Sequence, residues 1–415
     1  MNVARRVLPE AASRRGWCPS LARPMQTGDG LLARVHPPLG HLTAAQARAV
    51  AEGARRFGNG HIDVTARANL QIRGVTPETQ GTLAPHLTAV GLGDIRADGG
   101  PQRLTLTAPL FGLSDLAEAV EAIGRAIPGL PPKALVAIEE TGASGLGRAD
   151  ADIQLRMVAP DGIAWSLAGP DGPIWFAPVT TARALAHVSE SLIVLAGSGA
   201  RRMRDLDTSR RNRLAGTAMP APSPISSLAP GLHDLGDGRT ALAVETAFGR
   251  CTADALDRLA AWSERLASPG LALSPTRGFV FVGRDRDDVD RARHALGGDG
   301  FIHEADDPRG HVAACPGAPA CASGSTPTLI DAARLAEALK GTSIDAHVSG
   351  CAKGCAHPGA ATLTLVGRSG RYGIVLHGRP DGEPTMQLTF EAALDRVRSA
   401  DPSQTLAQAF RTTTP

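Results

Sequence analysis

The sequence has few aromatic residues, little net charge and no long apolar run. Phe, Trp and Tyr make up 3% of the 415 residues, so we expect Leu, Val, Ile and Ala to fill the cores. The formal net charge is +2, which gives no general electrostatic support for nucleic-acid binding. No run approaches the roughly 18 apolar residues of a membrane-spanning helix.

The first residues also lack the pattern of a secretory signal. Residues 1–17 contain arginines, but no apolar segment follows them. We therefore expect a soluble, cytoplasmic protein that binds neither nucleic acid nor a membrane. The chain has six cysteines, and in a reducing compartment clustered cysteines are typical of metal or redox sites rather than disulfides.

The chain contains a long internal repeat. Gly40 aligns with Gly249, and Gly74 with Gly283, at an offset of 209 residues in both cases. Identity is low, but the apolar pattern and the turn glycines coincide over the 44 positions from residue 31 to residue 74. A repeat of this length predicts a duplicated domain rather than a solenoid.

Each copy has the pattern of a strand–helix–strand–strand unit. In the first copy, Thr43 and Gln46 form a capping box at the start of the helix, and Gly58 ends it. We expect its strands at residues 31–36, 61–65 and 70–74. A longer α/β stretch follows each copy, at 95–225 and 302–415, and residues 216–231 have the composition of a linker between the halves.

Four cysteines form two closely spaced pairs. Cys315 and Cys321 give C-x5-C, and Cys351 with Cys355 gives C-x3-C. Four thiolates can hold a 4Fe–4S cluster. Zinc is the alternative, although its knuckles usually have a tighter C-x2-4-C spacing. The remaining alternative is four unrelated buried cysteines.

The segment between the pairs predicts how they meet. A helix over 328–340 and a strand over 344–348 would bring both cysteine loops to the ends of one unit. Gly317 and Gly350 leave room for backbone N–H groups to approach the sulfurs, which stabilises an anionic cluster.

Two cysteine pairs after a duplicated unit resemble the sulfite and nitrite reductase family over nearly the whole chain. In that family the four cysteines bind a 4Fe–4S cluster, and the last also contacts the iron of sirohaem. The resemblance implies an α+β fold of two pseudo-symmetric halves. The implied units are ferredoxin-like half-domain 1 (20–90), an α/β sulfite-reductase-type domain without cluster (95–225), ferredoxin-like half-domain 2 (232–300) and an α/β domain carrying the cluster (302–415).

Two segments resemble one branch of that family, which acts in aerobic cobalamin biosynthesis. They are RRGWCPSLARPMQTGDGLLARV at 14–35 and SGCAKGCAHPGAATLTLVG at 349–367. That branch is a monooxygenase that uses dioxygen to hydroxylate precorrin-3A and close a lactone. The resemblance implies a tetrapyrrole substrate, a mononuclear non-haem iron beside the cluster, and an external electron donor, either NADH-linked or a protein.

The resemblance also assigns substrate-binding residues. Arg34 stands where the reductases bind their substrate anion, and TARANLQ keeps Arg67 and Gln71 of a motif that contacts sirohaem carboxylates. Arg103 matches a second anion-binding arginine, and Lys133 matches the first lysine of an LPxKxK pair. Taken singly, each of these residues also fits a purely structural place on a strand or beside a turn. The resemblance assigns no catalytic residue.

One departure from the family's pattern bears on which reaction the protein catalyses. The sequence LPPKAL has Leu135 where the reductases have a second lysine. A reductase concentrates positive charge to hold a small anion, so the leucine fits neutral dioxygen better. Ala243 stands in the second repeat where Arg34 stands in the first. We therefore expect only one of the two pseudo-symmetric sites to be active. The alternatives are a sirohaem-dependent sulfite or nitrite reductase and a non-enzymatic electron-transfer protein.

Three further features receive no assigned role. Residues 200–213 contain six arginines, which would line a pocket for substrate carboxylates or form a solvated helix face. His357 is either an iron ligand or a structural loop histidine. Cys18 lies in a matching segment, but no function follows for it.

Overall fold

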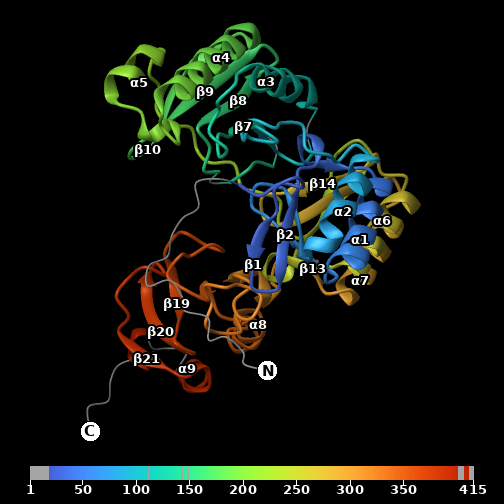
Figure 1. The fold of residues 1–415 in the computed structure, drawn as a ribbon, viewed down its shortest axis with the longest axis vertical. Helices are drawn as coiled ribbons and strands as arrows, with labels where there is room; N and C mark the ends of the chain where they lie inside the picture. The colour runs from blue at the N-terminus through green and yellow to red at the C-terminus, as the bar shows by residue number, and fades with distance from the viewer. Residues whose placement is uncertain (1–17, 111, 142–143, 148, 401–405, 411–415) are drawn as a thin grey trace.

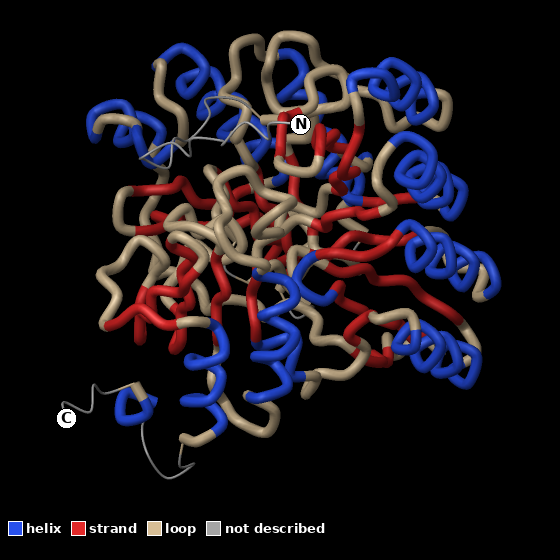
Figure 2. The backbone as a smooth tube through the Cα atoms, turned by 60° about the horizontal axis from the view of Figure 1, so that its bottom comes forward, coloured by secondary structure: helices blue, strands red, loops and turns tan. Residues whose placement is uncertain are grey.

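The computed structural model describes residues 18–400 and 406–410, except residues 111, 142–143 and 148. The expectation about a secretory signal falls on residues 1–17 and lies outside the described residues. The fold is α+β, as predicted, with the helices at the outside of the molecule and the strands towards its middle (Figure 2). No described helix is long and apolar enough to cross a membrane.

Both copies of the repeat form the predicted unit. The first contains β1 (Met25–Thr27), β2 (Gly30–Val35), β3 (His41–Leu42), α1 (Ala44–Phe57), β4 (His61–Val64), β5 (Leu70–Val75) and α2 (Pro77–Thr88). The second contains β11 (Gly231–Asp234), β12 (Thr240–Thr246), β13 (Arg250–Thr252), α6 (Ala253–Arg265), β14 (Leu271–Ser274), β15 (Gly278–Gly283), α7 (Arg286–Gly298) and β16 (Phe301–Ile302).

Local chemistry explains where these elements begin and end. Thr43 and Gln46 form the predicted capping box at the start of α1, and Gly58 caps its end. Two residues of unusual backbone conformation occur at corresponding positions of the copies. Leu39 has a φ of 49° and Phe248 a φ of 57°. Because residues other than glycine rarely adopt positive φ, this shared geometry supports the duplication.

The two copies exchange an edge strand. The first sheet has the order β1-β2-β5-β4-β13, so its last strand comes from the second copy. The second sheet has the order β11-β12-β15-β14-β3, and its last strand comes from the first copy. Both copies also share one hydrophobic core, and α1 packs against α6 (Figure 1). The repeats are therefore two halves of one packed structure.

Each α/β stretch forms a five-stranded sheet of the same design. The first contains β6 (Thr105–Thr107), α3 (Ser114–Ala126), β7 (Val136–Glu140), β8 (Ile153–Ala159), β9 (Gly162–Gly169), β10 (Gly172–Val179), α4 (Thr181–Ser198) and α5 (Thr208–Leu214). The second contains β17 (Val312–Ala314), α8 (Thr328–Ala338), β18 (Ala346–Ser349), β19 (Ala361–Arg368), β20 (Arg371–Gly378), β21 (Met386–Leu388), α9 (Phe390–Arg398) and α10 (Leu406–Ala409). Four 3₁₀ turns, at Pro38–Gly40, Met203–Asp205, Ala247–Gly249 and Pro308–His311, complete the described helical segments.

The two α/β sheets have identical strand order and direction. Their orders are β6-β7-β8-β9-β10 and β17-β18-β19-β20-β21. In each, the first three strands run parallel and the last two pair antiparallel. The predicted pair of pseudo-symmetric halves is therefore confirmed for the α/β units as well as for the repeats.

The segment between the halves is extended and attached to the first α/β unit. Residues 215–230 contain no helix and no named strand. Backbone oxygens of this segment nevertheless accept hydrogen bonds: Ser226 from Gly145 N–H at 2.8 Å, and Ser223 from Arg156 Nη1 at 2.8 Å. The predicted linker thus lies against the protein surface.

Candidate functional site

One face of the first sheet carries a row of polar side chains. Arg34 on β2 lies opposite Gln71 on β5, Gln71 lies opposite Asp63 on β4, and Asp63 lies opposite Arg250 on β13. Residues opposite each other on neighbouring strands point to the same face of a sheet. The row therefore crosses the sheet, and its last member is supplied by the exchanged strand of the second copy.

The corresponding face of the second sheet is apolar. Ala243, Ala272 and Val280 stand where the first copy has Arg34, Asp63 and Gln71. All three are buried, and Leu110 and Leu228 are among the side chains that pack against them. The first sheet thus has a polar face, whereas apolar side chains cover the corresponding face of the second sheet, as the alanine at 243 predicted.

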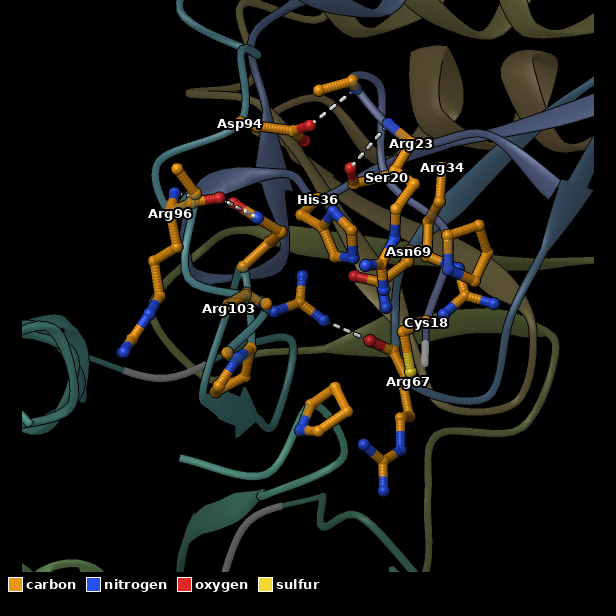
Figure 3. Close-up of a pocket in the computed structure, with 18 of the residues that line it drawn as sticks. Cys18, Ser20, Arg23, Arg34, His36, Arg67, Asn69, Asp94, Arg96 and Arg103 are labelled. Atoms are coloured by element: carbon orange, nitrogen blue, oxygen red, sulfur yellow. Dashed lines mark hydrogen bonds between the residues drawn. The ribbon is translucent and has the colours of Figure 1, made fainter. Parts of the chain in front are cut away.

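A cavity lies where the polar face meets the first α/β unit. It encloses about 230 Å³. Its lining includes three of the predicted site residues, Arg34, Arg67 and Arg103 (Figure 3). It also includes Cys18, His36, Asn69 and Leu135. The remaining predicted residues, Gln71 and Lys133, are absent from the lining of this cavity.

Arg34 and Gln71 form a direct pair. The Nε and Nη2 atoms of Arg34 donate hydrogen bonds of 3.1 and 2.7 Å to Oε1 of Gln71. Burial lowers the pKa of the Arg34 guanidinium, and the Cys18 side chain beside it opposes that shift. Gln71 therefore orients Arg34 rather than lining the cavity itself.

Arg103 is buried, and its hydrogen bonds connect the first repeat to the first α/β unit. Its guanidinium donates to the carbonyl oxygens of Thr105 at 3.0 Å, Pro37 at 3.1 Å and Ala68 at 2.9 Å. It also donates to the carbonyl oxygen of Arg67 (Figure 3). Burial lowers its pKa to about 10. The four hydrogen-bond acceptors are neutral, and the charge of Glu121 opposes part of the shift in the pKa of Arg103.

Arg67 and Lys133 meet in a way that the sequence did not predict. Nη1 of Arg67 donates a hydrogen bond of 3.0 Å to the backbone oxygen of Lys133. The Lys133 side chain is exposed, whereas Leu135, two residues on, is 3% exposed and lines the cavity. At this position the cavity wall is thus apolar, and the retained lysine points elsewhere.

Two lining residues that the sequence analysis did not single out have a buried polar atom without a partner. Asn69 is 6% exposed, and its Oδ1 has no hydrogen-bond partner among the described residues. Nδ1 of His36 is likewise buried without a partner, and burial, then Arg34 and Arg103, lower the pKa of this imidazole well below its usual value. His36 follows Arg34 by two positions, a spacing that would have signalled the same side of the chain.

The two cysteine loops converge as predicted. The backbone N–H of Gly350 donates to Sγ of Cys315 at 3.2 Å, across 35 residues of sequence. Burial, then the neighbouring thiols of Cys315, Cys351 and Cys321, raise the pKa of Cys355 to about 11. The thiols are therefore close enough to repel one another as thiolates, a repulsion that bound iron would relieve.

Glycines make the close approach of these loops feasible. A Cβ on Gly317, whose φ is 60°, would lie 2.2 Å from Oγ1 of Thr328. A Cβ on Gly350 would lie 3.2 Å from the Cα atoms of Gly317 and Gly324. Small residues thus let backbone reach the sulfurs, and the donor set fits an iron–sulfur cluster.

The geometry does not suit a single metal ion. Within the described parts of the chain, no three His, Cys, Asp or Glu side chains gather closely enough to hold one ion. A structural zinc needs four ligands within about 2.3 Å of one centre, so the described residues give no support to a zinc site. The same result assigns no ligands to the second iron that the resemblance implies.

The first cysteine loop touches the polar face directly. The oxygen of Ala320 accepts from Nη2 of Arg73 at 2.6 Å and from the N–H of Gly28 at 3.1 Å. A Cβ on Gly28 would lie 2.0 Å from the oxygen of Pro319, so only glycine fits there. The polar row therefore extends from the cavity to the cysteines.

The other unassigned features have structural partners. Arg202 donates to Asp152 at 3.0 Å and to Asp150 at 3.1 Å, and Arg204 also donates to Asp150. These pairs hold the arginine-rich segment against the first α/β unit. Nε2 of His357 lies 3.3 Å from the oxygen of Ala360 within its own loop.

Comparisons with known proteins agree with this architecture. Residues 23–90 match the family described as the nitrite/sulfite reductase ferredoxin-like half domain. The NirA protein of Mycobacterium tuberculosis has a similar fold, with a TM-score of 0.68, 20% identity, and coverage of 91% of this chain and 83% of that one.

Sequence relatives fall into two groups. A precorrin-3B synthase from Sinorhizobium sp. is 37% identical over 400 residues, which are 90% of this chain and 85% of the relative. A ferredoxin–nitrite reductase of Leptolyngbya laminosa is 32% identical over 109 residues, covering 26% of this chain and 21% of the relative. The ferredoxin–nitrite reductase of Synechococcus elongatus is 35% identical over 103 residues, covering 25% and 20%.

Proposed function

Since this chain belongs to the precorrin-3B synthase family, among the nitrite and sulfite reductase-like proteins, we propose that it hydroxylates precorrin-3A with dioxygen and closes a lactone, in the cytoplasm. One oxygen atom enters the substrate. The other leaves as water, which takes two electrons from an external donor and two protons.

The observation that carries this proposal is the cationic cavity on the polar half of a duplicated scaffold. Arg34, Arg67 and Arg103 supply three guanidinium groups to one small space. A guanidinium attracts carboxylates through its charge and through the N–H groups that other partners leave free, and precorrin-3A carries many carboxylates. At about 230 Å³ the cavity is smaller than a whole tetrapyrrole, so it receives one carboxylate-bearing edge while the ring lies along the polar face.

Leu135 supports an oxygenase over a reductase. A multi-electron reductase of sulfite or nitrite gains from each positive charge that faces its anion. Here the cavity wall carries a buried leucine at that position and the Lys133 side chain points to solvent. An apolar wall suits neutral dioxygen.

The cysteines support the electron supply. Cys315, Cys321, Cys351 and Cys355 would hold a 4Fe–4S cluster, which supplies single electrons when bound. The N–H of Gly350 donates a hydrogen bond to Sγ of Cys315, and Arg73 holds the first cysteine loop against the polar face of the first sheet. The mononuclear iron remains part of the proposal without assigned ligands.

Product analysis tests the reaction. Purified protein would be loaded with precorrin-3A without oxygen and then exposed to ¹⁸O₂ with a reductant, and the product mass measured. We expect the product to gain one labelled oxygen atom. A product of unchanged mass contradicts the oxygenase proposal. Sirohaem absorption bands in the purified protein, with sulfite or nitrite consumed instead, would establish the reductase.

A further inference from the structure

Arg277 lies in a turn of the second copy that corresponds to the turn containing Arg67 in the first copy. It lies between β14 and β15, and its counterpart 209 positions earlier is Ala68. Both residues have positive φ, 51° at Ala68 and 67° at Arg277. The turn geometry is conserved between the copies, while the arginine is displaced by one position, so its side chain takes a different direction.

The guanidinium of Arg277 reaches the second cysteine loop. Its Nη2 donates a hydrogen bond of 2.6 Å to the oxygen of Ala356, the residue directly after Cys355. The backbone oxygen of Arg277 accepts from Oγ1 of Thr246 at 2.6 Å. A Cβ on Gly249 would lie 2.9 Å from Nη1, so this glycine leaves the space that the guanidinium occupies.

The charge of Arg277 acts on both cysteine pairs. Burial lowers the pKa of its guanidinium, and the charges of Asp63, Cys355 and Cys315 oppose that shift. Cys355 belongs to the second loop and Cys315 to the first, so one cation is within electrostatic reach of both. Lys353, in the second cysteine loop, is another cation, and its Nζ donates a hydrogen bond of 3.1 Å to Oγ of Ser323.

We propose that Arg277 is a positioning residue that holds the second cysteine loop through Ala356 and raises the reduction potential of the cluster. Reduction adds one negative charge to a cluster with four thiolate ligands. A cation held beside the second cysteine loop stabilises that added charge. The inference rests on the cluster in the proposed function, and it does not depend on the substrate.

Two substitutions separate charge from structure. Arg277→Gln keeps side-chain N–H donors and removes the charge, whereas Arg277→Lys keeps the charge and loses the planar fork. Arg371→Gln is the control: it makes the same change of net charge at an exposed residue at the start of β20. Each variant would be purified without oxygen, its iron and sulfide counted, and its cluster titrated with redox mediators while its electron paramagnetic resonance signal is followed.

We expect Arg277→Gln to retain iron and sulfide while its ratio of reduced to oxidised cluster, at the wild-type midpoint, falls at least tenfold. That change corresponds to a midpoint lower by about 59 mV for one electron. Arg277→Lys and Arg371→Gln should stay within threefold of wild type. An unshifted potential in a fully loaded Arg277→Gln protein overturns the inference.

If Arg277→Gln loses its iron, the Arg277→Lys variant tests whether the charge at this position raises the reduction potential. A loaded lysine variant with the wild-type potential supports the role of the charge. A loaded lysine variant whose ratio falls tenfold overturns it, because the charge alone then does not maintain the potential. A wild-type protein without iron and sulfide would contradict the proposed function instead, so the two failures are distinguishable.

Discussion

Arg250, on a strand of the second repeat, donates a hydrogen bond of 2.6 Å from Nε to Oδ1 of Asp63, on a strand of the first. The side chains are 14% and 10% exposed, so water screens the pair weakly. Arg73 also lies 3.4 Å from Asp63. The pair therefore connects β13, the exchanged strand, to the polar face of the first sheet.

Removal of this carboxylate should destabilise the fold. Asp63→Ala leaves Arg250 without its carboxylate partner, while Arg73 keeps Asp29 at 2.7 Å. Breaking a pair that is largely shielded from water in this way costs about 3–5 kcal/mol. The control is Glu264→Ala, which breaks the inter-repeat pair with Arg48 at 2.7 Å. That pair is 42% and 48% exposed and is worth about 0–1 kcal/mol. Urea unfolding measures both, and equal losses would contradict the importance of the buried pair.

Loss of one of the four cysteines proposed to hold the cluster should release iron. Cys321→Ser removes one of the four thiols that converge, so we expect most of the iron and acid-labile sulfide to be lost. Cys18→Ser is the matched control because Cys18 lines the cavity beside Arg34 and lies outside the cysteine loops. Iron and sulfide assays on anaerobically purified protein give the answer. Equal iron content in both variants would argue against the cluster.

Arg67 and Lys133 should differ in their effect on substrate binding. Arg67→Gln removes a cavity guanidinium, and a hydrogen bond to a charged group is worth about 1.5–3 kcal/mol. We therefore expect tetrapyrrole binding to weaken about tenfold to a hundredfold. Lys133→Gln changes an exposed side chain, so the effect should stay below about threefold. Fluorescence quenching with uroporphyrin as probe compares them, and a larger loss from Lys133 would reverse the assignment.

A lysine at position 135 should make the cavity bind small anions better. Leu135→Lys places a fourth cation beside Arg34, Arg67 and Arg103, and we expect sulfite to bind about tenfold more tightly, equivalent to about 1.4 kcal/mol. Leu135→Met, which conserves volume and charge, should leave the affinity unchanged. Isothermal titration calorimetry with sulfite tests the pair. No difference between the two variants would mean that position 135 does not face the anion.

Glu245 should make stability depend on pH. Burial raises its pKa to about 6 from an ordinary 4.5, and a hydrogen bond from Thr276 opposes that shift. The folded state then binds the proton more tightly, so stability falls as the pH rises from 4.5 to 6. Glu245→Gln imitates the protonated form and should be about 1–2 kcal/mol more stable than wild type at pH 7. At pH 4 the two proteins should match in urea unfolding, and a constant difference across this range would contradict the shift.

Local signals in the sequence were sufficient for the elements of each repeat. The capping box at Thr43 and the glycine at 58 define the first helix, and the structure has its bounds at Ala44–Phe57. The helix expected over 328–340 ends slightly earlier, at Ala338, and the strand expected over 344–348 is shifted to Ala346–Ser349. Capping and alternation act within a few residues, so they survive without knowledge of the fold.

Residue types and order along the chain thus determined the duplicated α+β scaffold, the two cysteine pairs and the loss of an arginine at Ala243. Only the tertiary structure decided that β3 and β13 change sheets, that Leu110 and Leu228 fill the second face, and that Leu135 turns into the cavity while Lys133 turns away. The physical reason is range. Strand exchange and cavity walls depend on packing between segments far apart in sequence, which no local pattern encodes.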